Sequence, residues 1–388
     1  MQTGKIEFKN FQKSKKNLIV SKILKNLKKK FENKKNLFFL SFSKKYVHSF
    51  KLRDLLKYKK FNFFTIIGMG GSSLGAKAIY SFLNFKIKKK FNFLDNIDHE
   101  KFQIKKTKSL NIVISKTGNT LETVTNLNTL SNIKNSIFIT ERNNNYLRKI
   151  ANKMQSKVFE HKDYIGGRYS VLSETGMLPA CLMGLDHQKF KVLDNLILNK
   201  KFQNQLIMNV SSILKFYKKK KTNSIILNYD QSSQDLFYWY QQLVAESLGK
   251  KSKGILPIIS IMPKDNHSLM QLYLDGNKNN FFTFFRVEEK FSNRINEKYL
   301  NSSFSFLSNK NINDVKKAQF EATQNVFKKR GIPFRSFVVK KRDEKTLGEL
   351  FCFFILETII LGEALNINPF DQPAVELIKK ETYKVLKS

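Results

Sequence analysis

The stretch FNFFTIIGMGGSSLGAK, residues 61–77, decides the fold. Its first half is apolar and rich in aromatic and β-branched residues, which is typical of a buried central strand. The turn GMGGSSLG follows, and then AKAIYSFL, whose apolar residues recur at helical spacing. A strand, a glycine-rich turn and a helix predict a phosphate cradle, because glycine lets the backbone approach an anion and the helix N-terminus offers free N–H groups.

This turn departs from two familiar nucleotide-binding loops. A Walker A loop closes with Gly-Lys-Ser/Thr, whereas Gly75 is followed here by Ala76. A Rossmann fingerprint has a third glycine where Ser73 stands, although Asp95 lies at about the spacing of a ribose-binding acid. A dinucleotide site therefore stays open, and so does a glycine-rich turn without a ligand.

The composition indicates a two-domain protein with a strong positive charge. The 388 residues suffice for two domains, and 70 Lys and Arg against 31 Asp and Glu give a net charge of +39. Such a charge is typical of nucleic-acid binding. However, the lysines are spread along the whole chain beside Asn, Ile and Phe, which share A/T-rich codons. We therefore expect no nucleic acid as the primary ligand, although a positive field attracts anionic metabolites.

The cysteines and the apolar runs set the expected compartment. Cys181 and Cys352 offer neither a disulfide framework nor the spacing of metal ligands. The start MQTGKIEFKN lacks the apolar core of a signal peptide. The longest apolar run, residues 350–361, is interrupted by Glu357 and is too short to span a bilayer. We expect a cytoplasmic protein without membrane attachment or a bound metal, in which residues 350–361 form a buried helix.

Strand and helix patterns alternate from residue 61 onward. After the first strand, further strands are predicted at residues 91–94, 110–114, 136–140, 157–159, 223–228, 255–261 and 281–287. This alternation predicts an α/β fold with doubly wound parallel sheets. The expected domains are a lysine-rich helical arm (1–59), a first α/β domain (60–205) and a second one with C-terminal helices (206–388).

A second polar loop, SKTGNTLET (115–123), follows the predicted strand before it. It carries the hydroxyl groups of Ser115, Thr117 and Thr120. Loops at the carboxyl ends of adjacent parallel strands face one crevice, so this loop and the glycine-rich turn are expected to hold one phosphate. The alternative is a helix start that is capped by Thr120 or Asn119, and both interpretations are compatible.

Two further stretches contain candidates for acid–base chemistry. Arg168 follows two glycines in GGRYSVLSETG, where it is placed to stabilise a developing oxyanion, and the plain alternative is a surface arginine. The helix predicted at residues 235–250 has its apolar residues on one side and Gln242 and Glu246 on the other. A glutamate that faces a crevice is a candidate general base, although an exposed glutamate is the default interpretation.

His267 in NHSLMQLYLDG and Lys379 in NPFDQPAVELIKK complete the candidates. A single histidine is more often structural than catalytic. The second stretch predicts a helix that starts around residues 371–373, on which Gln372 and Lys379 share a face. The alternative is a lysine on an amphipathic terminal helix.

Seven stretches of the chain resemble the signatures of the glucose-6-phosphate isomerase (phosphoglucose isomerase) family, and they occur in the same order as in that family. They are GMGGSSLG, DNID, SKTGNTLET, GGRYSVLSETGMLPA, QQLVAESLGK, NHSLMQLYLDG and NPFDQPAVELIKK, within about residues 61–382. The resemblance implies two sugar-isomerase (SIS) domains, each a flavodoxin-like parallel sheet flanked by helices. It also implies reversible conversion of glucose 6-phosphate to fructose 6-phosphate through a cis-enediol, without a cofactor.

The resemblance further implies a role for each candidate residue. Glu246 matches the catalytic base and Arg168 the residue that stabilises the enediolate, while His267 and Lys379 match the pair that opens the sugar ring. The residues that match the substrate-binding positions are Gly71, Ser72, Ser115, Lys116 (through its backbone), Thr117, Thr120, Gln242 and Gln372. In the family the equivalent of His267 comes from the partner subunit, which implies a homodimer with shared active sites.

Four residues depart from the family pattern. Gly118 and Asn119 replace the aromatic-threonine pair within SKTFTT, Asn266 replaces the usual glutamine before the histidine, and Ala374 replaces a glycine. None of these changes removes a reacting group, but they leave the packing around the phosphate and the choice among sugars open.

Three alternative functions therefore remain. They are an isomerase that also acts on mannose 6-phosphate, a non-catalytic SIS-type sensor of sugar phosphates, and a nicotinamide dehydrogenase that uses Asp95. Glu246 argues against the sensor, because a protein that only binds a sugar phosphate does not need a carboxylate beside Gln242, His267 and Lys379.

Overall fold

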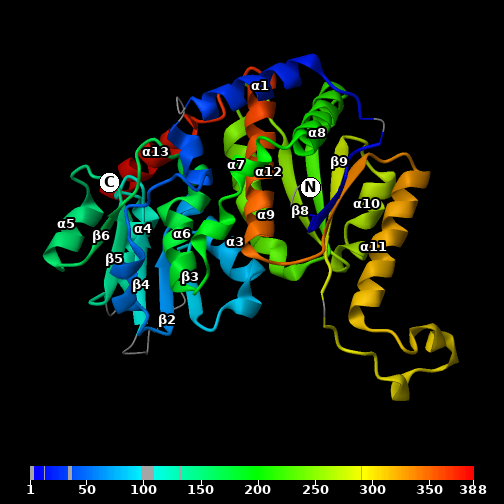
Figure 1. Cartoon of the computed structure of the whole chain (residues 1–388), viewed down its shortest axis with the longest axis horizontal. Helices are drawn as coiled ribbons and strands as arrows, with labels where there is room; N and C mark the ends of the chain where they lie inside the picture. Colours follow the sequence, from blue (N-terminus) through cyan, green and yellow to red (C-terminus); the bar gives the residue numbers. More distant parts are fainter. Residues whose placement is uncertain (1–3, 13, 34–36, 98–108, 131–132, 290) are drawn as a thin grey trace.

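The computed structural model consists of two five-stranded sheets that lie side by side and are covered by helices (Figure 1). It describes residues 4–12, 14–33, 37–97, 109–130, 133–289 and 291–388. The strand orders are β3-β2-β4-β5-β6 in the first sheet and β1-β10-β9-β7-β8 in the second. All described strand pairs are parallel except β1 with β10. The α/β fold with two parallel sheets is thus confirmed.

The first sheet places the two polar loops next to each other. Its strands are β2 (Phe63–Ile67), β3 (Lys90–Leu94), β4 (Ser109–Ile114), β5 (Ser136–Thr140) and β6 (Val158–Glu160). Its helices are α3 (Leu74–Phe82), α4 (Leu121–Thr129), α5 (Tyr146–Lys153) and α6 (Glu174–Leu182). The strand order changes direction between β2 and β4, and ligands of open α/β sheets bind at such a switch point, beyond the carboxyl ends of the strands.

The second sheet repeats this winding and gains an antiparallel edge strand. Its strands are β7 (Asn223–Asn228), β8 (Leu256–Ile261), β9 (Asn280–Val287), β10 (Phe334–Val339) and β1 (Ile6–Lys9). Its helices include α8 (Lys200–Lys218), α9 (Gln234–Leu248), α10 (Met270–Asp275), α11 (Ile312–Lys329) and α12 (Glu344–Ala364). The last helix, α13 (Val375–Lys387), lies on the side of the first sheet (Figure 1).

The predicted strands agree with the structure to within about two residues at each end. The N-terminal segment contains a helix, α1 (Leu18–Glu32), as expected for a helical arm, but also β1, which was not predicted. Since Ile6 pairs with Val339 of β10, the start of the chain joins the second sheet. The domain boundaries at residues 59 and 205 stay predictions. Asp98, the last residue of the DNID stretch, lies outside the described residues.

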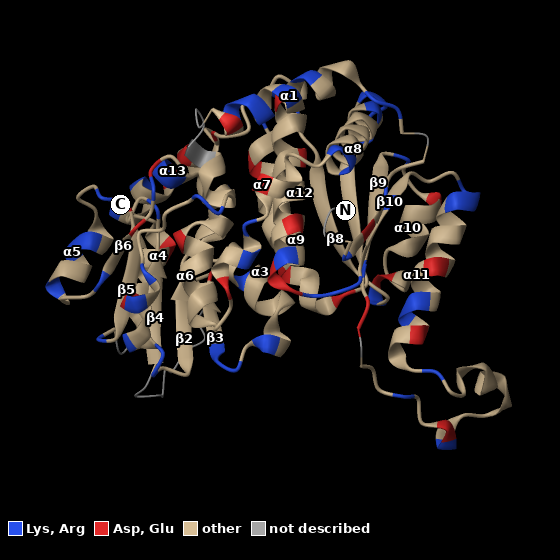
Figure 2. Ribbon diagram, viewed as in Figure 1, with Lys and Arg blue, Asp and Glu red and all other residues tan. Residues whose placement is uncertain are grey.

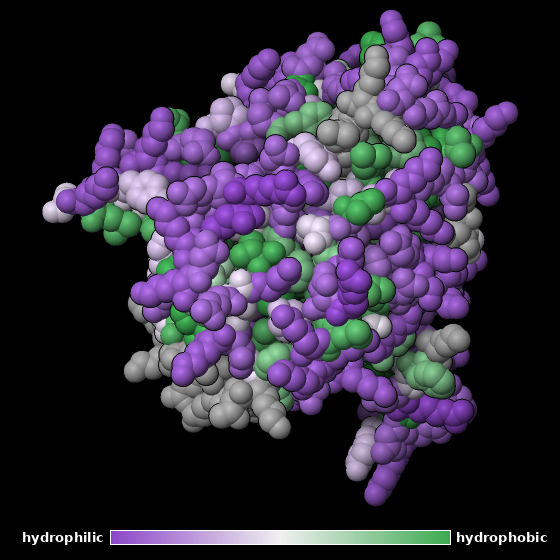
Figure 3. All heavy atoms as spheres, turned by 60° about the vertical axis from the view of Figure 1, so that its left-hand side comes forward, coloured by the Kyte–Doolittle hydropathy of each residue, from purple (hydrophilic) through white to green (hydrophobic). Residues whose placement is uncertain are grey.

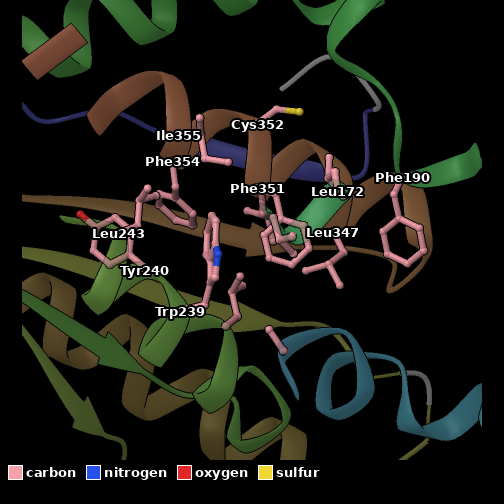
Figure 4. Packing of buried hydrophobic residues seen from close by; sticks show 14 of the residues in the cluster. Leu172, Phe190, Trp239, Tyr240, Leu243, Leu347, Phe351, Cys352, Phe354 and Ile355 are labelled. Carbon is pink, nitrogen blue, oxygen red and sulfur yellow. The ribbon is translucent and has the colours of Figure 1, made fainter. Parts of the chain in front are cut away.

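The core between α9 and α12 fixes the helix that carries Glu246 (Figure 4). Trp239 packs edge-on against Phe351 with ring centroids 4.7 Å apart, and Tyr240 lies 4.7 Å from Phe354. Each fully buried side chain of this size stabilises the fold by roughly 1.5–3 kcal/mol. The apolar run at residues 350–361 lies within α12 and is buried, as predicted.

The charges are not gathered in one place. Figure 2 shows Lys and Arg on many helices and loops of both halves, and Figure 3 shows a mostly hydrophilic face with apolar side chains in small groups. In the described part of the chain, every helix is too short or too polar to span a lipid bilayer.

Candidate active site

Helix α9 presents Glu246 and Gln242 on its less buried side. The opposite side, with Phe237, Tyr240 and Val244, is buried, as the apolar spacing predicted. Gln242 Nε2 donates a hydrogen bond of 2.8 Å to Oε1 of Glu246, one turn further along the helix. The Glu246 side chain remains 31% exposed, so its carboxylate is accessible to a ligand.

Arg168 connects this carboxylate to a distant segment of the chain. It lies in a 3-10 helix, η5 (Gly167–Leu172), and its side chain is only 2% exposed. Its Nη1 lies 3.1 Å from Oε2 of Glu246 and donates a 2.7 Å hydrogen bond to Oε1 of Gln372. The alternative of a surface arginine is therefore wrong.

Every N–H group of Arg168 has an acceptor. Besides the two Nη1 contacts, Nη2 donates to the backbone carbonyls of Pro369 (2.7 Å) and Asp371 (3.0 Å), and Nε donates to Ser247 Oγ (2.9 Å). Tyr169 strengthens this arrangement, because its hydroxyl also contacts Ser247 Oγ (2.9 Å) and the Pro369 carbonyl (2.8 Å). A guanidinium has five donors in a rigid plane, so five bonds fix both its position and its orientation.

Ser247 and Tyr169 were not identified as functional from the sequence. Ser247 directly follows Glu246, and Tyr169 directly follows Arg168, and both of these preceding residues were identified. Their roles depend on contacts between residues about 80 to 200 positions apart, which no local pattern reveals. The only available signal was membership of the same two motifs.

The glycine-rich turn packs directly against these residues. A Cβ atom on Gly70, whose φ is +52°, would lie 2.6 Å from Nε2 of Gln242. A Cβ atom on Gly71 would lie 2.1 Å from the carbonyl oxygen of Gly167. Only glycine allows this approach, which brings the predicted phosphate cradle up to Glu246 and Arg168.

The two polar loops of the first sheet meet at Gly68. A Cβ atom there would lie 2.8 Å from the carbonyl oxygen of Ile114 and 2.9 Å from Cβ of Ser72. Ser115, the next residue after Ile114, is 1% exposed, and its Oγ lies 2.8 Å from Oγ1 of Thr120. The structure thus brings Ser72, Ser115 and Thr120 to one end of the sheet.

Thr120 does not cap the helix that it precedes. It is the N-cap residue of α4, but its hydroxyl makes no capping hydrogen bond and contacts Ser115 instead. The Asn119 side chain accepts a 3.0 Å hydrogen bond from the backbone N–H of Tyr146, at the start of α5. Thr117 is exposed, with its Oγ1 3.5 Å from the backbone nitrogen of Asn119. The capping alternative for α4 is therefore wrong for both residues.

The departure at Gly118 has a structural reason. Gly118 has a φ of +69°, and a Cβ atom there would lie 2.0 Å from Oδ1 of Asn145. Asn145 Nδ2 donates to Thr140 Oγ1 (3.1 Å), and that hydroxyl donates to the Lys116 carbonyl (3.2 Å). Asn145 therefore fills the space that a larger side chain at position 118 would need, and Asn145 and Thr140 together stabilise the loop through these hydrogen bonds.

The side chain of Lys116 points away from the hydroxyl groups. Its Nζ donates a 2.6 Å hydrogen bond to the Asp163 carbonyl and lies 3.6 Å from Oε1 of Glu141. The backbone carbonyl of Lys116 accepts hydrogen bonds from Thr140 Oγ1 (3.2 Å) and from the Glu141 N–H (3.0 Å).

The structure does not bring His267 and Lys379 to this site. His267 is exposed after the 3-10 helix η8 (Lys264–Asn266), and its ring forms no hydrogen bond or ion pair with the described residues. Lys379 is also exposed on α13, and its Nζ pairs with Oε1 of Glu376 at 2.6 Å.

The expectation that Gln372 and Lys379 share a helix face is wrong. Helix α13 begins at Val375, so Gln372 precedes it and reaches Arg168 instead. Pro373 explains this start, because a proline disfavours the helical conformation of the residue before it.

A cavity of about 630 Å³ adjoins Glu246. It lies between the end of α9, the turn that begins at Lys250, and the segment that carries Asp371 and Gln372. Lys250 Nζ lies 2.8 Å from Oδ1 of Asp371, and this contact holds the pKa of Asp371 below its usual range. In the part of the chain described above, no group of three or more His, Cys, Asp or Glu side chains is arranged to hold a metal ion.

Comparison with known proteins agrees with this geometry. The profile of the family described as phosphoglucose isomerase matches residues 56–388. The chain is 33% identical to the glucose-6-phosphate isomerase of Methanocaldococcus jannaschii, over 86% of this chain and 87% of that protein. It is 34% identical to a probable glucose-6-phosphate isomerase of Methanococcus maripaludis, over 87% of this chain and 81% of that protein.

Solved structures share the fold. A hypothetical protein from Thermus thermophilus aligns with a TM-score of 0.82 at 24% identity, over 95% of both chains. A glucose-6-phosphate isomerase from Chlamydia trachomatis aligns with a TM-score of 0.71 at 21% identity, over 87% of this chain and 72% of that one. With its family profile matched over most of its length, the chain belongs to the phosphoglucose isomerase family.

Proposed function

We propose that the protein is an isomerase that interconverts D-glucose 6-phosphate and D-fructose 6-phosphate. The observation that carries this proposal is the accessible carboxylate of Glu246, held between Arg168 and Gln242, with Gln242 packed against Gly70 of the glycine-rich turn. One carboxylate can remove the proton from C2 of the open-chain sugar and return it to C1. The reaction passes through a cis-enediol and involves no net redox change, so a nicotinamide is not required.

The phosphate is proposed to bind at the carboxyl ends of β2 and β4. Hydroxyl groups of Ser72, Ser115, Thr117 and Thr120, with backbone N–H groups of Gly71 and Lys116, would donate to its oxygens. The starts of α3 and α4 add the positive ends of their helix dipoles. This remote binding energy orients the reacting carbons near Glu246.

Arg168 is proposed to stabilise the negative charge of the enediolate. Its guanidinium is already positioned by five acceptors, so little reorganisation accompanies the developing charge. Gln242 and Gln372, which contact Glu246 and Arg168 respectively, would flank the sugar.

Ring opening is proposed to need a homodimer. His267 and Lys379, the candidates for this step, are exposed and make no contact with Glu246, so we assign the histidine to the partner subunit's site. Residues 291–311 project from the body of the molecule (Figure 1) and expose several aromatic side chains. These are Phe291, Tyr299, Phe304 and Phe306. Exposed apolar groups of this kind are typical of protein interfaces.

A coupled assay tests the proposed function. Purified protein receives fructose 6-phosphate, and the formation of glucose 6-phosphate is followed with a glucose-6-phosphate dehydrogenase in the presence of a chelator that the coupling enzyme tolerates. We expect turnover that the chelator does not reduce. Binding of fructose 6-phosphate without turnover would contradict the proposal and favour a sensor.

A further inference from the structure

A second cavity, of about 520 Å³, is lined mainly by lysine. Its lysines are Lys5, Lys44, Lys189, Lys191 and Lys345. They are five of the nine lining residues, whereas Lys and Arg together make up 70 of the 388 residues of the chain. The single acidic lining residue is Asp186, so the cavity is far more positive than an average part of this basic protein.

Four separate segments of the chain form this cavity. Lys5 directly precedes β1, Lys44 follows a 3-10 helix (Leu37–Phe42), and Lys345 lies in the first turn of α12. The fourth segment, residues 186–195, packs tightly on α12, because a Cβ atom on Gly348 would lie 2.1 Å from the Phe190 carbonyl oxygen. The lysines are therefore gathered by the tertiary fold and not by a local run of basic sequence.

Lys191 is the buried base of the cavity. The residue is 1% exposed, and its Nζ donates to the carbonyl oxygens of Ser41 (2.7 Å) and Leu172 (3.0 Å). The ammonium also lies 4.5 Å from the ring centre of Tyr46. These partners are all neutral, and no carboxylate of the described residues lies within ion-pair distance. Burial lowers the pKa of Lys191 to about 7, and the attraction of Glu174 opposes this shift. Because the residue is almost fully buried, it closes the base of the cavity without exposing its ammonium.

The remaining lysines leave positive charge without a counterion. Lys5 pairs with Asp343, and Lys189 lies 3.6 Å from Asp186. Lys44 and Lys345 are exposed and form no ion pair with the described residues. Two exposed ammonium groups, from separate segments at the rim of the cavity, are a suitable arrangement for an anion with charge at two points.

We propose that this cavity binds a small molecule that carries at least two phosphate groups. Its volume falls within the range of small-molecule sites, about 300–1,000 Å³. None of its lining residues is aromatic, so it offers no surface on which a nucleotide base could stack. The phosphates, and not an attached ring, are therefore the recognised groups.

This site is separate from the one at Glu246. Lys345 lies at the N-terminal end of α12, whereas the segment that carries Gln372 follows the C-terminal end. A helix of 21 residues is about 30 Å long. A ligand of this size cannot occupy both cavities at once, so the proposal does not depend on the isomerase reaction.

Calorimetric titration of the full-length protein with inorganic pyrophosphate tests the proposal. The test variant is Lys44→Gln with Lys345→Gln, and the matched control is Lys149→Gln with Lys153→Gln, which removes two exposed lysines from α5. We expect the test variant to bind roughly tenfold more weakly or worse, since each lysine makes a charge-assisted contact. The control should bind like the wild type.

Two results would overturn the proposal. Equal weakening in the test and control variants would mean that only the overall charge attracts the anion. Unchanged affinity in the test variant would mean that pyrophosphate binds elsewhere, for example at the loops after β2 and β4.

A further measurement addresses the number of phosphates. Inorganic phosphate should bind at least about tenfold more weakly than pyrophosphate, since it engages one charged end only. Equal affinity of the two ions would overturn the requirement for two phosphates.

Discussion

Nη1 of Arg168 lies 3.1 Å from Oε2 of Glu246 and, on its other side, 2.7 Å from Oε1 of Gln372. One buried cation thus connects a carboxylate on α9 with the segment between α12 and α13. The same guanidinium donates to the carbonyl oxygens of Pro369 and Asp371, so it both orients Glu246 and anchors the backbone beside it. This contact is the centre of the proposed mechanism.

Arg168→Lys should separate charge from geometry. Lysine keeps the positive charge, but its compact ammonium cannot serve five acceptors in a plane. We expect kcat to fall by about 10²–10³-fold, and the backbone amides of residues 366–372 to exchange faster with solvent. Steady-state kinetics and hydrogen exchange measure the two effects. Arg330→Lys, which alters an exposed ion pair, is the control and should change neither; a wild-type kcat in Arg168→Lys would contradict the role of the guanidinium.

Thr120→Ala should weaken binding of the sugar phosphate. Loss of one hydrogen bond to a charged group costs roughly 1.5–3 kcal/mol, which corresponds to an increase in KM of about tenfold to a hundredfold. Thr120→Ser keeps the hydroxyl and should restore most of the affinity. Thr129→Ala, at the other end of α4, is the matched control. An unchanged KM in Thr120→Ala would exclude this hydroxyl from the phosphate site.

Subunit mixing tests the shared active site. Glu246→Gln and His267→Ala chains should each be inactive as homodimers. After subunit exchange, the mixed dimer has one site with both defects and one with none, so part of the activity should return. Exchange is verified independently with a tag on one chain. Verified exchange without any recovery would show that each subunit builds its own site.

Acid should destabilise the fold through two buried histidines. Burial lowers the pKa of His48 and that of His161 to about 4, and both ring nitrogens of His48 lack a hydrogen-bond partner. Below the unfolded pKa of about 6.5 the unfolded chain binds protons that the folded chain does not. The free energy of unfolding should therefore fall as the pH decreases from 6.5 towards 4, by up to about 1.4 kcal/mol per pH unit for each histidine.

Urea unfolding at pH 7 and pH 5 measures this effect. His48→Phe, which suits the aromatic contact of His48 with Phe50, should remove about half of the decrease. A decrease of the same size in His48→Phe would rule out His48 as its source.

The fold was largely predictable, because most of its strands are runs of five to eight mainly apolar residues followed by polar loops. The two exceptions have physical reasons. β1 has only four residues, of which two are charged, and it is a strand only through its pairing with β10. β10 contains Arg335, whose buried charge is neutralised by Glu357 of α12, a partner that no local pattern could indicate.

The site was predictable where a motif carries its own geometry. Gln242 and Glu246 are one helical turn apart, so their common face follows from the sequence. The contact between Arg168 and Gln372 joins residues 204 positions apart and needs the assembled fold. The prediction that Gln372 and Lys379 lie on one face of a helix was wrong, because Pro373 prevents α13 from starting before Val375.

The central claim is that Glu246 transfers the proton. Glu246→Gln keeps the size and a hydrogen bond to Gln242 but cannot accept a proton, so kcat should fall by about 10²–10⁴-fold while substrate binding is nearly unchanged. Glu246→Asp withdraws the carboxylate by one methylene and should lose a smaller factor, about 10²-fold, because misplacement of this size is costly.

Exchange of the C2 proton with solvent tests this claim most directly. Wild-type protein, Glu246→Gln and the control Glu381→Gln, which alters the exposed partner of Lys384, are incubated with glucose 6-phosphate in tritiated water. Tritium at C2 is then measured before net conversion is significant. We predict incorporation by the wild type and the control, and a rate at least about 10²-fold lower in Glu246→Gln. Incorporation at the wild-type rate in Glu246→Gln would show that another group is the base and would contradict the proposed mechanism.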